Sequence, residues 1–410
     1  MRAFPAFFIA CFDTIRAWQP QNPPRPCEFA LDFSEVMYMI GGRCITITNK
    51  GGLCFYMKRI LLTGGGTAGH VTPNIALLPH LKEAGFDISY IGSYQGMEKE
   101  LIEAQGIPYY GISSGKLRRY FDPKNFSDPF KVVKGLGQAI HLIHKLKPNV
   151  VFSKGGFVSV PVVLAAKFCH VPAIIHESDI TPGLANKIAI PCATKVCCNF
   201  PETMKYLPAD KAVLTGSPIR RELLRGDASA ARELCGFDES RPVLFIIGGS
   251  SGSVIINRVV REALPTLLEH FQVAHMCGKG NLEPSLAPTK GYRQFEYIGR
   301  ELNDIFAMSD IVVSRAGANS ICELQALHKP NLLIPLSAAA SRGDQILNAS
   351  SFEKQGFSKV LLEENLNEKS LIEAVEELYK DRDRYIRAMK ESRSLDSIDM
   401  IVELLEKVAK

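Results

Sequence analysis

The chain is 410 residues long, 46% hydrophobic and 22% charged, with a formal net charge of +5. This length exceeds one ordinary hydrophobic core and predicts two or three domains. No apolar run approaches the roughly 20 residues that a membrane-spanning helix needs, so the composition excludes a protein with helical membrane spans. The eleven cysteines stand at irregular spacing without a C-x-x-C pair, which favours reduced thiols over disulfides or a zinc site.

Residues 1–56 differ in composition from the rest of the chain. They hold the single tryptophan, Trp18, four of the eleven cysteines and a proline-rich stretch at 19–26, with no alternation of strands and helices. A short apolar run near the start lacks the cleavage site of a signal peptide. Met57 directly precedes the first expected strand, and residues 50–52 are what a ribosome-binding sequence would encode. We therefore expect residues 1–56 to be a non-native or disordered extension.

Twice the chain runs from a short apolar strand through a glycine-rich turn into a helix, at 58–70 and at 243–253. Continuous β-branched and leucine runs are typical of buried parallel strands, and glycines let the backbone turn sharply beside a ligand. The helix that follows directs its free N–H groups and the positive end of its dipole at that ligand, which favours phosphate. Two such loops predict two nucleotide-binding domains.

The elements between and after these loops alternate along the chain. In the first half we expect helices at 73–84, 97–105, 130–146, 160–168 and 184–190, and strands at 87–92, 107–112, 149–152 and 173–176. In the second half we expect strands and helices at 243–247, 255–269, 272–276, 295–297, 305–308, 311–314, 320–327 and 331–335, then mostly helix after 371. This alternation predicts an α/β fold of parallel sheets wrapped by helices, with ligands at the carboxyl ends of the strands.

One surface segment, 116–147, is strongly basic. Eight lysines and arginines face two aspartates there, with aromatic residues interleaved. The segment fits a solvated helix face with a loop. It also fits a surface that rests on anionic lipid, where basic side chains are attracted and apolar side chains insert. Composition leaves both interpretations open.

Seven glycine-rich or polar motifs follow one another between residues 64 and 349. They are GGGTAGHVTP at 64–73, SKGGFVS at 153–159, HESD at 176–179, GSPIR at 216–220, GGSSGS at 248–253, RAGANSICE at 315–323 and GDQILNA at 343–349. In this order they resemble the motifs of the MurG family, the peptidoglycan glycosyltransferases of glycosyltransferase family 28.

The resemblance implies a GT-B fold, in which two Rossmann-like domains face a central cleft. It implies inverting transfer of N-acetylglucosamine from UDP-GlcNAc to undecaprenyl-pyrophosphoryl-MurNAc-pentapeptide (lipid I), giving lipid II without metal or other cofactor. It places the protein peripherally on the cytoplasmic face of the bacterial cell membrane, with no nucleic-acid partner and with cell-wall synthesis proteins as candidate partners.

Four segments follow from the same resemblance. Residues 1–56 precede the family pattern. Residues 57–217 would form the acceptor- and membrane-binding domain and residues 218–394 the UDP-GlcNAc-binding domain. Residues 395–410 would form a helix that packs back on the first domain.

The donor chemistry needs hydrogen-bond donors around a pyrophosphate that gains negative charge as it leaves. Ser250 and its loop amides suit this need, and Arg220 can add a bidentate contact that lysine would not reproduce. Without the family context, Ser250 fits an N-cap and Arg220 a surface ion pair. The remaining donor contacts that the resemblance implies are Thr67, Ala68, Gly69, Ala318, Asn319, Ser320, Ile321 and Cys322.

Three further positions would hold the nucleoside and the sugar. Glu323 would accept hydrogen bonds from the ribose hydroxyls, although it also fits an exposed helix carboxylate. Ile298 would line the uracil pocket, although it also fits ordinary core. Gln345 would bind the GlcNAc hydroxyls. Asp344 stands where the family often has glutamine, so its sugar contact is left open.

The inverting step needs a base for the acceptor hydroxyl. His70 on the first glycine loop is the candidate, because an imidazole titrates near neutrality; it also fits a binder of the lipid pyrophosphate. Glu177 is a second candidate that would otherwise orient His176. Gly155, Gly156 and Asp179 would bind the acceptor. Asp179 replaces the usual asparagine and can accept but not donate hydrogen bonds.

A lipid acceptor gives the basic segment a reason to meet the bilayer. The residues expected at the membrane surface are Lys116, Arg118, Arg119, Phe121 and Phe130. Three other functions remain possible on sequence: a GT-B enzyme with another lipid acceptor such as diacylglycerol, a UDP-GlcNAc 2-epimerase, and a nicotinamide oxidoreductase or non-catalytic nucleotide-binding module. The first loop lacks the G-x-G-x-x-G spacing of the last class.

Overall fold

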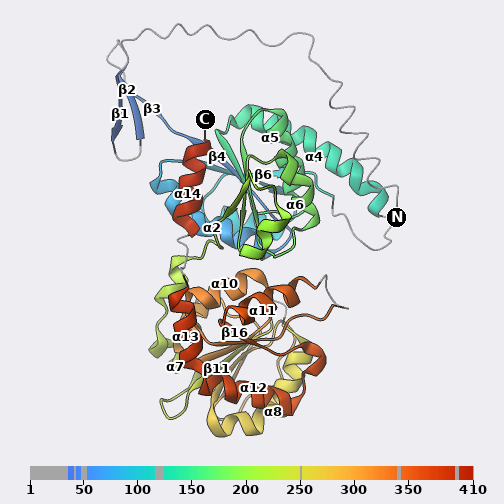
Figure 1. Ribbon diagram of the computed structural model, residues 1–410, viewed down its shortest axis with the longest axis vertical. Helices are drawn as coiled ribbons and strands as arrows, with labels where there is room; N and C mark the ends of the chain where they lie inside the picture. Colours follow the sequence, from blue (N-terminus) through green and yellow to red (C-terminus); the bar gives the residue numbers. More distant parts are fainter. Residues whose placement is uncertain are drawn as a thin grey trace. The chain divides into compact units, whose positions relative to one another are not determined.

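The computed structural model describes residues 36–40, 43–47, 53–115, 124–249, 252–338, 343–392 and 397–409. The chain divides into two units, Met1–Tyr56 and Met57–Lys410. In the smaller unit β1 (Val36–Ile40), β2 (Arg43–Ile47) and β3 (Leu53–Tyr56) pair as an antiparallel sheet (Figure 1). The expectation of a non-native or disordered extension over 1–56 stays a prediction.

The first domain of the larger unit is built on a parallel sheet in the order β10-β9-β8-β7-β4-β5-β6 (Figure 1). Its strands are β4 (Arg59–Thr63), β5 (Asp87–Ser93), β6 (Tyr109–Ile112), β7 (Val150–Ser153), β8 (Ala173–Glu177), β9 (Lys195–Cys198) and β10 (Ala212–Leu214). Its helices are α2 (Ala68–Glu83), α3 (Met97–Glu103), α4 (Lys124–Leu146), α5 (Ser159–Phe168) and α6 (Leu184–Ala189).

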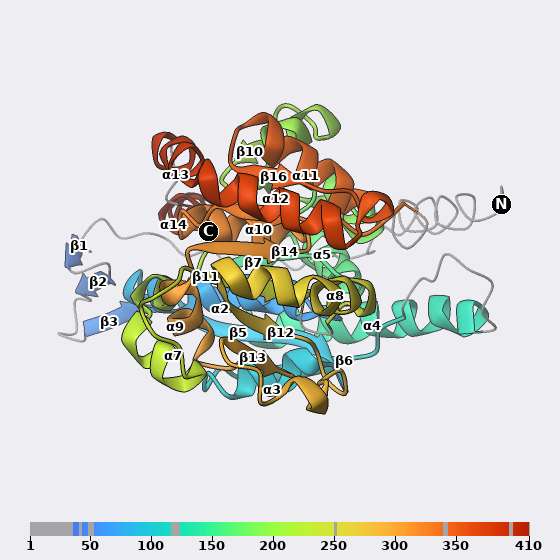
Figure 2. The same cartoon turned by 90° about the horizontal axis from the view of Figure 1, so that it is seen from below.

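The second domain has a parallel sheet in the order β13-β12-β11-β14-β15-β16. Its strands are β11 (Val243–Ile247), β12 (Gln272–Met276), β13 (Tyr292–Phe295), β14 (Ile311–Ser314), β15 (Asn331–Leu333) and β16 (Ser358–Val360). Its helices are α7 (Ala228–Cys235), α8 (Val254–His270), α9 (Leu302–Met308), α10 (Ala318–Ala326), α11 (Asp344–Lys354), α12 (Glu368–Lys380) and α13 (Arg382–Glu391). Helices α8 and α12 lie side by side (Figure 2). The expected α/β fold of two Rossmann-like parallel-sheet domains is confirmed.

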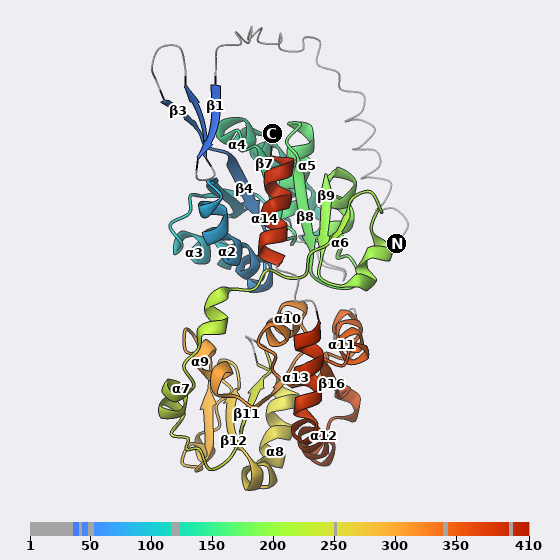
Figure 3. The ribbon, with the colours of Figure 1, turned by 60° about the vertical axis from the view of Figure 1, so that its left-hand side comes forward.

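The apolar strands bury both faces of the first sheet. Ile60 and Leu62 of β4 point to one hydrophobic cluster, and Leu61 between them points to the other. This alternation follows from the period of two along a strand. Helices therefore cover both faces, as a parallel sheet requires. On the first face the last helix, α14 (Ser397–Val408), joins the cluster beside α2 (Figure 3).

Several element boundaries differ from the expectation. The strand expected at 295–297 is wrong, because the paired residues are Tyr292–Phe295 and the Tyr297 side chain is exposed. An apolar–polar–apolar triplet at 295–297 imitates a strand there. Helix α2 begins at Ala68, about one turn before the expected Pro73, so Gly69 and His70 lie in its first turn. The short strands β9 and β10 were not predicted.

The topology positions the loops that matter for function. In each sheet the strand order reverses once, between β4 and β7 in the first and between β11 and β14 in the second. Open α/β sheets bind ligands at the carboxyl ends of the strands beside such a reversal. The glycine loops at 64–69 and 155–156 follow β4 and β7, and the loops at 248–252 and 315–317 follow β11 and β14.

Candidate active site

The first glycine loop rests on a buried carboxylate. Glu98, at the start of α3, is completely buried. Its Oε2 accepts from the Gly66 amide at 3.3 Å, and its Oε1 accepts from the Ser93 amide and hydroxyl at 3.0 and 2.5 Å. A Cβ on Gly65 would lie 2.7 Å from this carboxyl group. The glycine at that position therefore lets the loop approach its support closely.

His70 lies in the first turn of α2 and is half-buried. Its Nδ1 is 2.9 Å from the Thr67 hydroxyl, and its amide donates to the Thr67 carbonyl. The neighbouring Gly69 carbonyl accepts from the side chain of Asn319 at 2.8 Å. Asn319 belongs to α10 of the second domain. The structure therefore brings the predicted catalytic loop and the predicted nucleotide-binding helix into contact.

The second glycine loop lies directly against the first. Gly155 and Gly156 have φ of 89° and 85°, in the left-handed region that favours glycine. A Cβ on Gly156 would lie 2.2 Å from the Gly65 carbonyl oxygen. No side chain fits there, so the two loops can meet only if this residue is glycine.

The segment after β8 is held by the buried carboxylate of Glu177. Its two oxygens accept from the amides of Asp179 and Gly183 at 3.0 and 2.9 Å and from the Asn186 side chain at 2.8 Å. Burial raises the pKa of Glu177, and these three N–H donors oppose the rise. These three hydrogen bonds all come from nitrogen donors, so Glu177 orders the turn that carries Asp179.

The same turn contacts the second domain. The Thr181 hydroxyl donates to the Asp344 carboxylate at 2.9 Å, and the Asn348 side chain donates to Asp179 Oδ1 at 3.2 Å. Asp344 and Asn348 lie on α11, one turn apart. Both acidic departures from the family pattern, Asp179 and Asp344, therefore lie where the predicted acceptor segment meets the predicted sugar-binding helix.

On the donor side the glycine loop after β11 leads into α8. Ser250, the predicted pyrophosphate ligand, lies outside the described residues. Gly252 has φ of 73°, and a Cβ there would lie 1.9 Å from the Cys277 carbonyl oxygen. The Ser253 hydroxyl accepts from the Ile256 amide at 3.4 Å and caps α8. The helix N-terminus is thus fixed at the loop, as phosphate binding requires.

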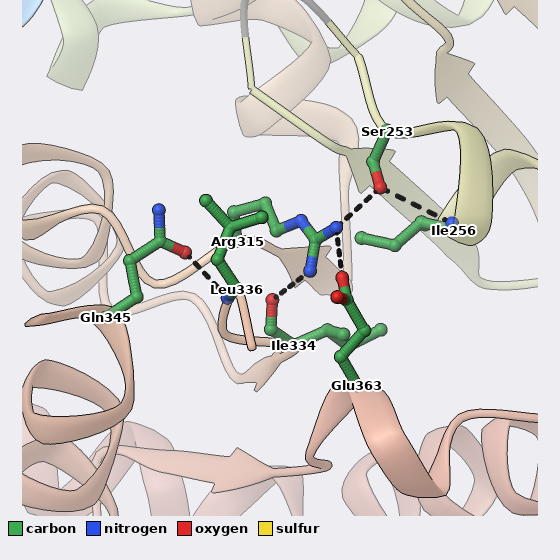
Figure 4. Close-up of polar contacts among 7 residues, drawn as sticks. All are labelled: Ser253, Ile256, Arg315, Ile334, Leu336, Gln345 and Glu363. Carbon is green, nitrogen blue, oxygen red and sulfur yellow. Dashed lines mark hydrogen bonds and ion pairs between the residues drawn. The ribbon is translucent and has the colours of Figure 1, made fainter. Parts of the chain in front are cut away.

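Arg315, at the carboxyl end of β14, supports this loop (Figure 4). Its guanidinium donates to the Ser253 hydroxyl at 2.7 Å and to the Ile334 carbonyl at 3.1 Å. It also forms an ion pair of 2.5 Å with the Glu363 carboxylate. Nearby, the Gln345 side-chain oxygen accepts from the Leu336 amide at 3.1 Å (Figure 4). One buried cation therefore joins three segments of the second domain.

The predicted nucleoside contacts lie around α10, which carries Ala318, Asn319, Ser320, Ile321, Cys322 and Glu323. Burial raises the pKa of Glu323 to about 6, and the nearby Arg220 guanidinium opposes the rise. Arg220 Nε is buried and has no hydrogen-bond partner within the described part of the chain. Ile298 is buried in the core of the second domain. The Arg220 guanidinium therefore lies close enough to the Glu323 carboxylate to favour its charged form.

Most residues predicted at the membrane surface lie outside the described residues: Lys116, Arg118, Arg119 and Phe121. Phe130 on α4 is described and is 77% exposed, and Val133 one turn later is 59% exposed. Across the described ranges no helix is both long and apolar enough to cross a bilayer. In the same ranges no three His, Cys, Asp or Glu side chains gather as a metal site, and the cysteines from Cys169 to Cys322 are free thiols.

Comparison with known proteins decides the family. The glycosyltransferase family 28 N-terminal domain matches residues 60–198, and the family 28 C-terminal domain matches residues 243–404. The chain belongs to glycosyltransferase family 28. The UDP-N-acetylglucosamine--N-acetylmuramyl-(pentapeptide) pyrophosphoryl-undecaprenol N-acetylglucosamine transferase of Lachnospira eligens is 65% identical over 350 residues, which are 85% of this chain and 99% of that relative. The enzyme of that name from Lachnoclostridium phytofermentans is 64% identical over 352 residues, 86% and 99% of the two chains.

Solved structures give the same fold for this family 28 chain. The crystal structure of Acinetobacter baumannii MurG matches with a TM-score of 0.69 at 24% identity, covering 85% of this chain and 99% of that one. The glycosyltransferase of kitacinnamycin matches with a TM-score of 0.68 at 14% identity, covering 87% and 100%. At these identities the likeness establishes the GT-B architecture alone.

Sequence reasoning missed four residues that shape the site: Glu98 under the first loop, Lys154 in the second, and Thr181 and Asn348 at the domain contact. Lys154, Thr181 and Asn348 stand inside or beside the glycine-rich and polar motifs, so their position was a usable signal. Glu98 stands in none of them, and the contacts of Glu98, Thr181 and Asn348 reach segments far away in sequence. Only the fold brings those partners together.

Proposed function

We propose that this protein transfers N-acetylglucosamine from UDP-GlcNAc to the muramyl-pentapeptide carried on undecaprenyl pyrophosphate. The observation that carries the proposal is the relative named for this reaction, 65% identical over 99% of its own length. The glycine loops at both sheet reversals support it, because each offers a phosphate-binding position.

The second domain would bind UDP-GlcNAc. The loop at 248–252 and the N-terminus of α8 would hold the pyrophosphate, with Ser250 and Arg220 as further donors. As the sugar bond breaks, negative charge develops on that group, and donors already in place stabilise it. Glu323 would accept from the ribose hydroxyls, and Ile298 would line the base pocket. Gln345 would donate to the GlcNAc hydroxyls through its amide nitrogen, since its oxygen already accepts from Leu336.

His70 is the proposed base or acceptor ligand of the first domain. When its Nδ1–H donates to the Thr67 hydroxyl, Nε2 keeps a lone pair that can accept the proton of the acceptor hydroxyl. Attack by that oxygen on the sugar C1 expels UDP and inverts the configuration at this carbon. Glu177 is the weaker candidate base, because both its oxygens already accept hydrogen bonds from nitrogen.

Gly155, Gly156 and Asp179 would contact the acceptor. A narrow turn free of side chains suits the close approach of a pyrophosphate, and the Asp179 carboxylate would accept from an acceptor hydroxyl or amide. Asp344, which already accepts from Thr181, would act at the domain contact rather than in sugar recognition.

Peripheral attachment to the cytoplasmic membrane face is part of the proposal. Phe130 and Val133 present apolar surface one turn apart on α4, next to the lysines of the basic segment. Lysine and arginine near an anionic leaflet each contribute about 1 kcal/mol, and the apolar side chains can insert. Such a contact weakens as salt rises.

UDP release from UDP-GlcNAc, measured with and without a lipid I analogue, tests the proposed function. We expect release that requires the acceptor. A diacylglycerol acceptor that replaces the analogue would indicate a different lipid glycosyltransferase. Release without any acceptor would indicate hydrolysis or epimerase-type chemistry, and no release at all would contradict a glycosyltransferase.

A further inference from the structure

Lys154 is a buried cationic residue that the proposed reaction does not use. It follows β7, directly before the two glycines of the second loop, and its side chain is 1% exposed. Its Nζ lies 2.7 Å from His176 Nδ1 and 3.0 Å from the Ser178 hydroxyl. Burying a lysine without an ion-paired carboxylate is unfavourable, so its presence calls for a function.

The direction of these hydrogen bonds follows from the third partner. His176 Nε2 lies 2.9 Å from the Gly216 carbonyl, which can only accept, so Nε2 carries the proton. Nδ1 is then an acceptor, and Lys154 donates to it. Burial lowers the pKa of Lys154 to about 7 and that of His176 below its usual value, in agreement with a neutral imidazole.

Three loops and the interdomain linker meet through this one side chain. Lys154 belongs to the second glycine loop, and its Cβ would lie 3.4 Å from a Cβ on Gly64 in the first. Its two acceptors lie on the segment that carries Glu177 and Asp179. Through His176 the chain of hydrogen bonds continues to Gly216, between the two domains.

We propose that Lys154 is a positioning residue for the acceptor, which holds the 176–179 segment in register with both glycine loops and with the linker. The inference rests on the proposed function for the identity of the acceptor. Two of the three N–H donors of Lys154 are already directed at His176 and Ser178, and these two contacts hold the segment without any contact between Lys154 and the acceptor.

The positioning role of Lys154 can be distinguished experimentally from a contribution of Lys154 to folding stability alone. Methionine has similar length and no desolvation penalty, but it leaves the buried His176 Nδ1 without its donor. Because these two effects oppose each other, we expect Lys154→Met to melt close to the wild type while it loses control of the acceptor loop. Lys154→Gln keeps two N–H donors on a shorter side chain, so its control of the acceptor loop should be intermediate between that of the wild type and that of Lys154→Met.

The experiment combines kinetics with hydrogen–deuterium exchange. For Lys154→Met we expect the acceptor KM to rise about tenfold, with the UDP-GlcNAc KM within about twofold. Amide exchange should become faster in peptides that cover 177–183 and 215–217. Lys167→Met is the matched control, because Lys167 is an exposed lysine of the same domain on α5; it should change neither quantity.

An unchanged acceptor KM overturns the proposal, and so does a raised acceptor KM without faster exchange, since the lysine would then act by direct contact. A donor KM that rises by the same factor also overturns it. If the wild type shows no acceptor-dependent transfer, the proposed function fails, and the exchange of 177–183 alone then decides the positioning role.

Discussion

The loops of the two sheets occupy equivalent topological places, yet they are supported in different ways. In the first domain the backbones of the two glycine loops are in direct contact at Gly156 and Gly65. The buried charged side chains beside these loops are Glu98 and Lys154. In the second domain the loop before α8 depends on one cation, Arg315, that reaches Ser253 and Glu363. The loops of the first domain depend on close steric fit of their backbones, whereas the loop of the second domain depends on the polar contacts of one side chain. Substitutions should therefore destabilise the first domain through steric overlap and the second through lost hydrogen bonds and a lost ion pair.

The largest loss is expected at the contact between the first two loops. Gly156→Ala introduces a Cβ 2.2 Å from a backbone oxygen at a φ of 85°, so strain and overpacking add. We expect the free energy of unfolding to fall by about 4 kcal/mol, measured by denaturant titration. The control is Gly106→Ala, with a φ of 68° and no atom within 4 Å of the new Cβ; it should lose about 1 kcal/mol. Equal losses would show that the contact between loops contributes nothing.

Arg315→Ala should give the next largest effect. It leaves Glu363 and the Ser253 hydroxyl without their partner, and removing one member of a buried ion pair costs about 3 kcal/mol. The UDP-GlcNAc KM should rise as well, because the N-terminus of α8 loses its support. Arg258→Ala is the control, since its ion pair with Glu262 is mostly exposed, and it should have no measurable effect. Similar stability for both variants would contradict the role of Arg315.

Glu323→Gln should separate binding from stability in the second domain. Burial raises the native pKa of Glu323 to about 6 from 4.5, so the native state holds its proton more tightly than the unfolded chain. Its contribution to stability is therefore full below pH 4.5 and is lost as pH rises through 6. We expect the variant to exceed the wild type by about 2 kcal/mol at pH 8, with the difference shrinking toward pH 4.5.

The UDP-GlcNAc KM of the same variant should rise, because an amide accepts hydrogen bonds from ribose less strongly than a carboxylate. Thermal melts across pH 4.5 to 8 measure the expected difference in stability, and kinetics with UDP-GlcNAc measure the expected change in KM. A variant that is less stable than the wild type at pH 8 would indicate that the electrostatic attraction of Arg220 for the Glu323 carboxylate outweighs the cost of burying it.

The smallest effect is expected at the membrane. Phe130→Ser should weaken binding to anionic vesicles about threefold, because one apolar side chain no longer inserts. Tyr297→Ser is the control, since Tyr297 is 68% exposed on the other domain and should leave vesicle binding unchanged. Cosedimentation at low and high salt measures both. Equal binding by the wild type and Phe130→Ser would exclude Phe130 from the membrane surface.

The fold could be predicted where neighbouring residues in the sequence determine the structure. The glycine loops after β4, β7 and β11 follow apolar runs and mark the sheet reversals, so their place could be derived from sequence. The strand at 295–297 was wrong because a triplet cannot reveal that β12 pairs with Tyr292. Lys154 and Glu98 were missed because each acts on residues brought near only by folding. The sequence shows that Asp179 and Asp344 replace the residues usual in the family motifs. It does not show that both lie at the contact between the two domains.

The stereochemistry of the product tests the central claim most directly. UDP-GlcNAc carries an α-linked sugar, and a single displacement by the acceptor hydroxyl must give a β-linked disaccharide on the lipid. The coupling constant of the new anomeric proton, measured by NMR on product formed with a lipid I analogue, distinguishes the two configurations. We predict the β-linked product. An α-linked product, or free N-acetylglucosamine without a disaccharide, would contradict the account.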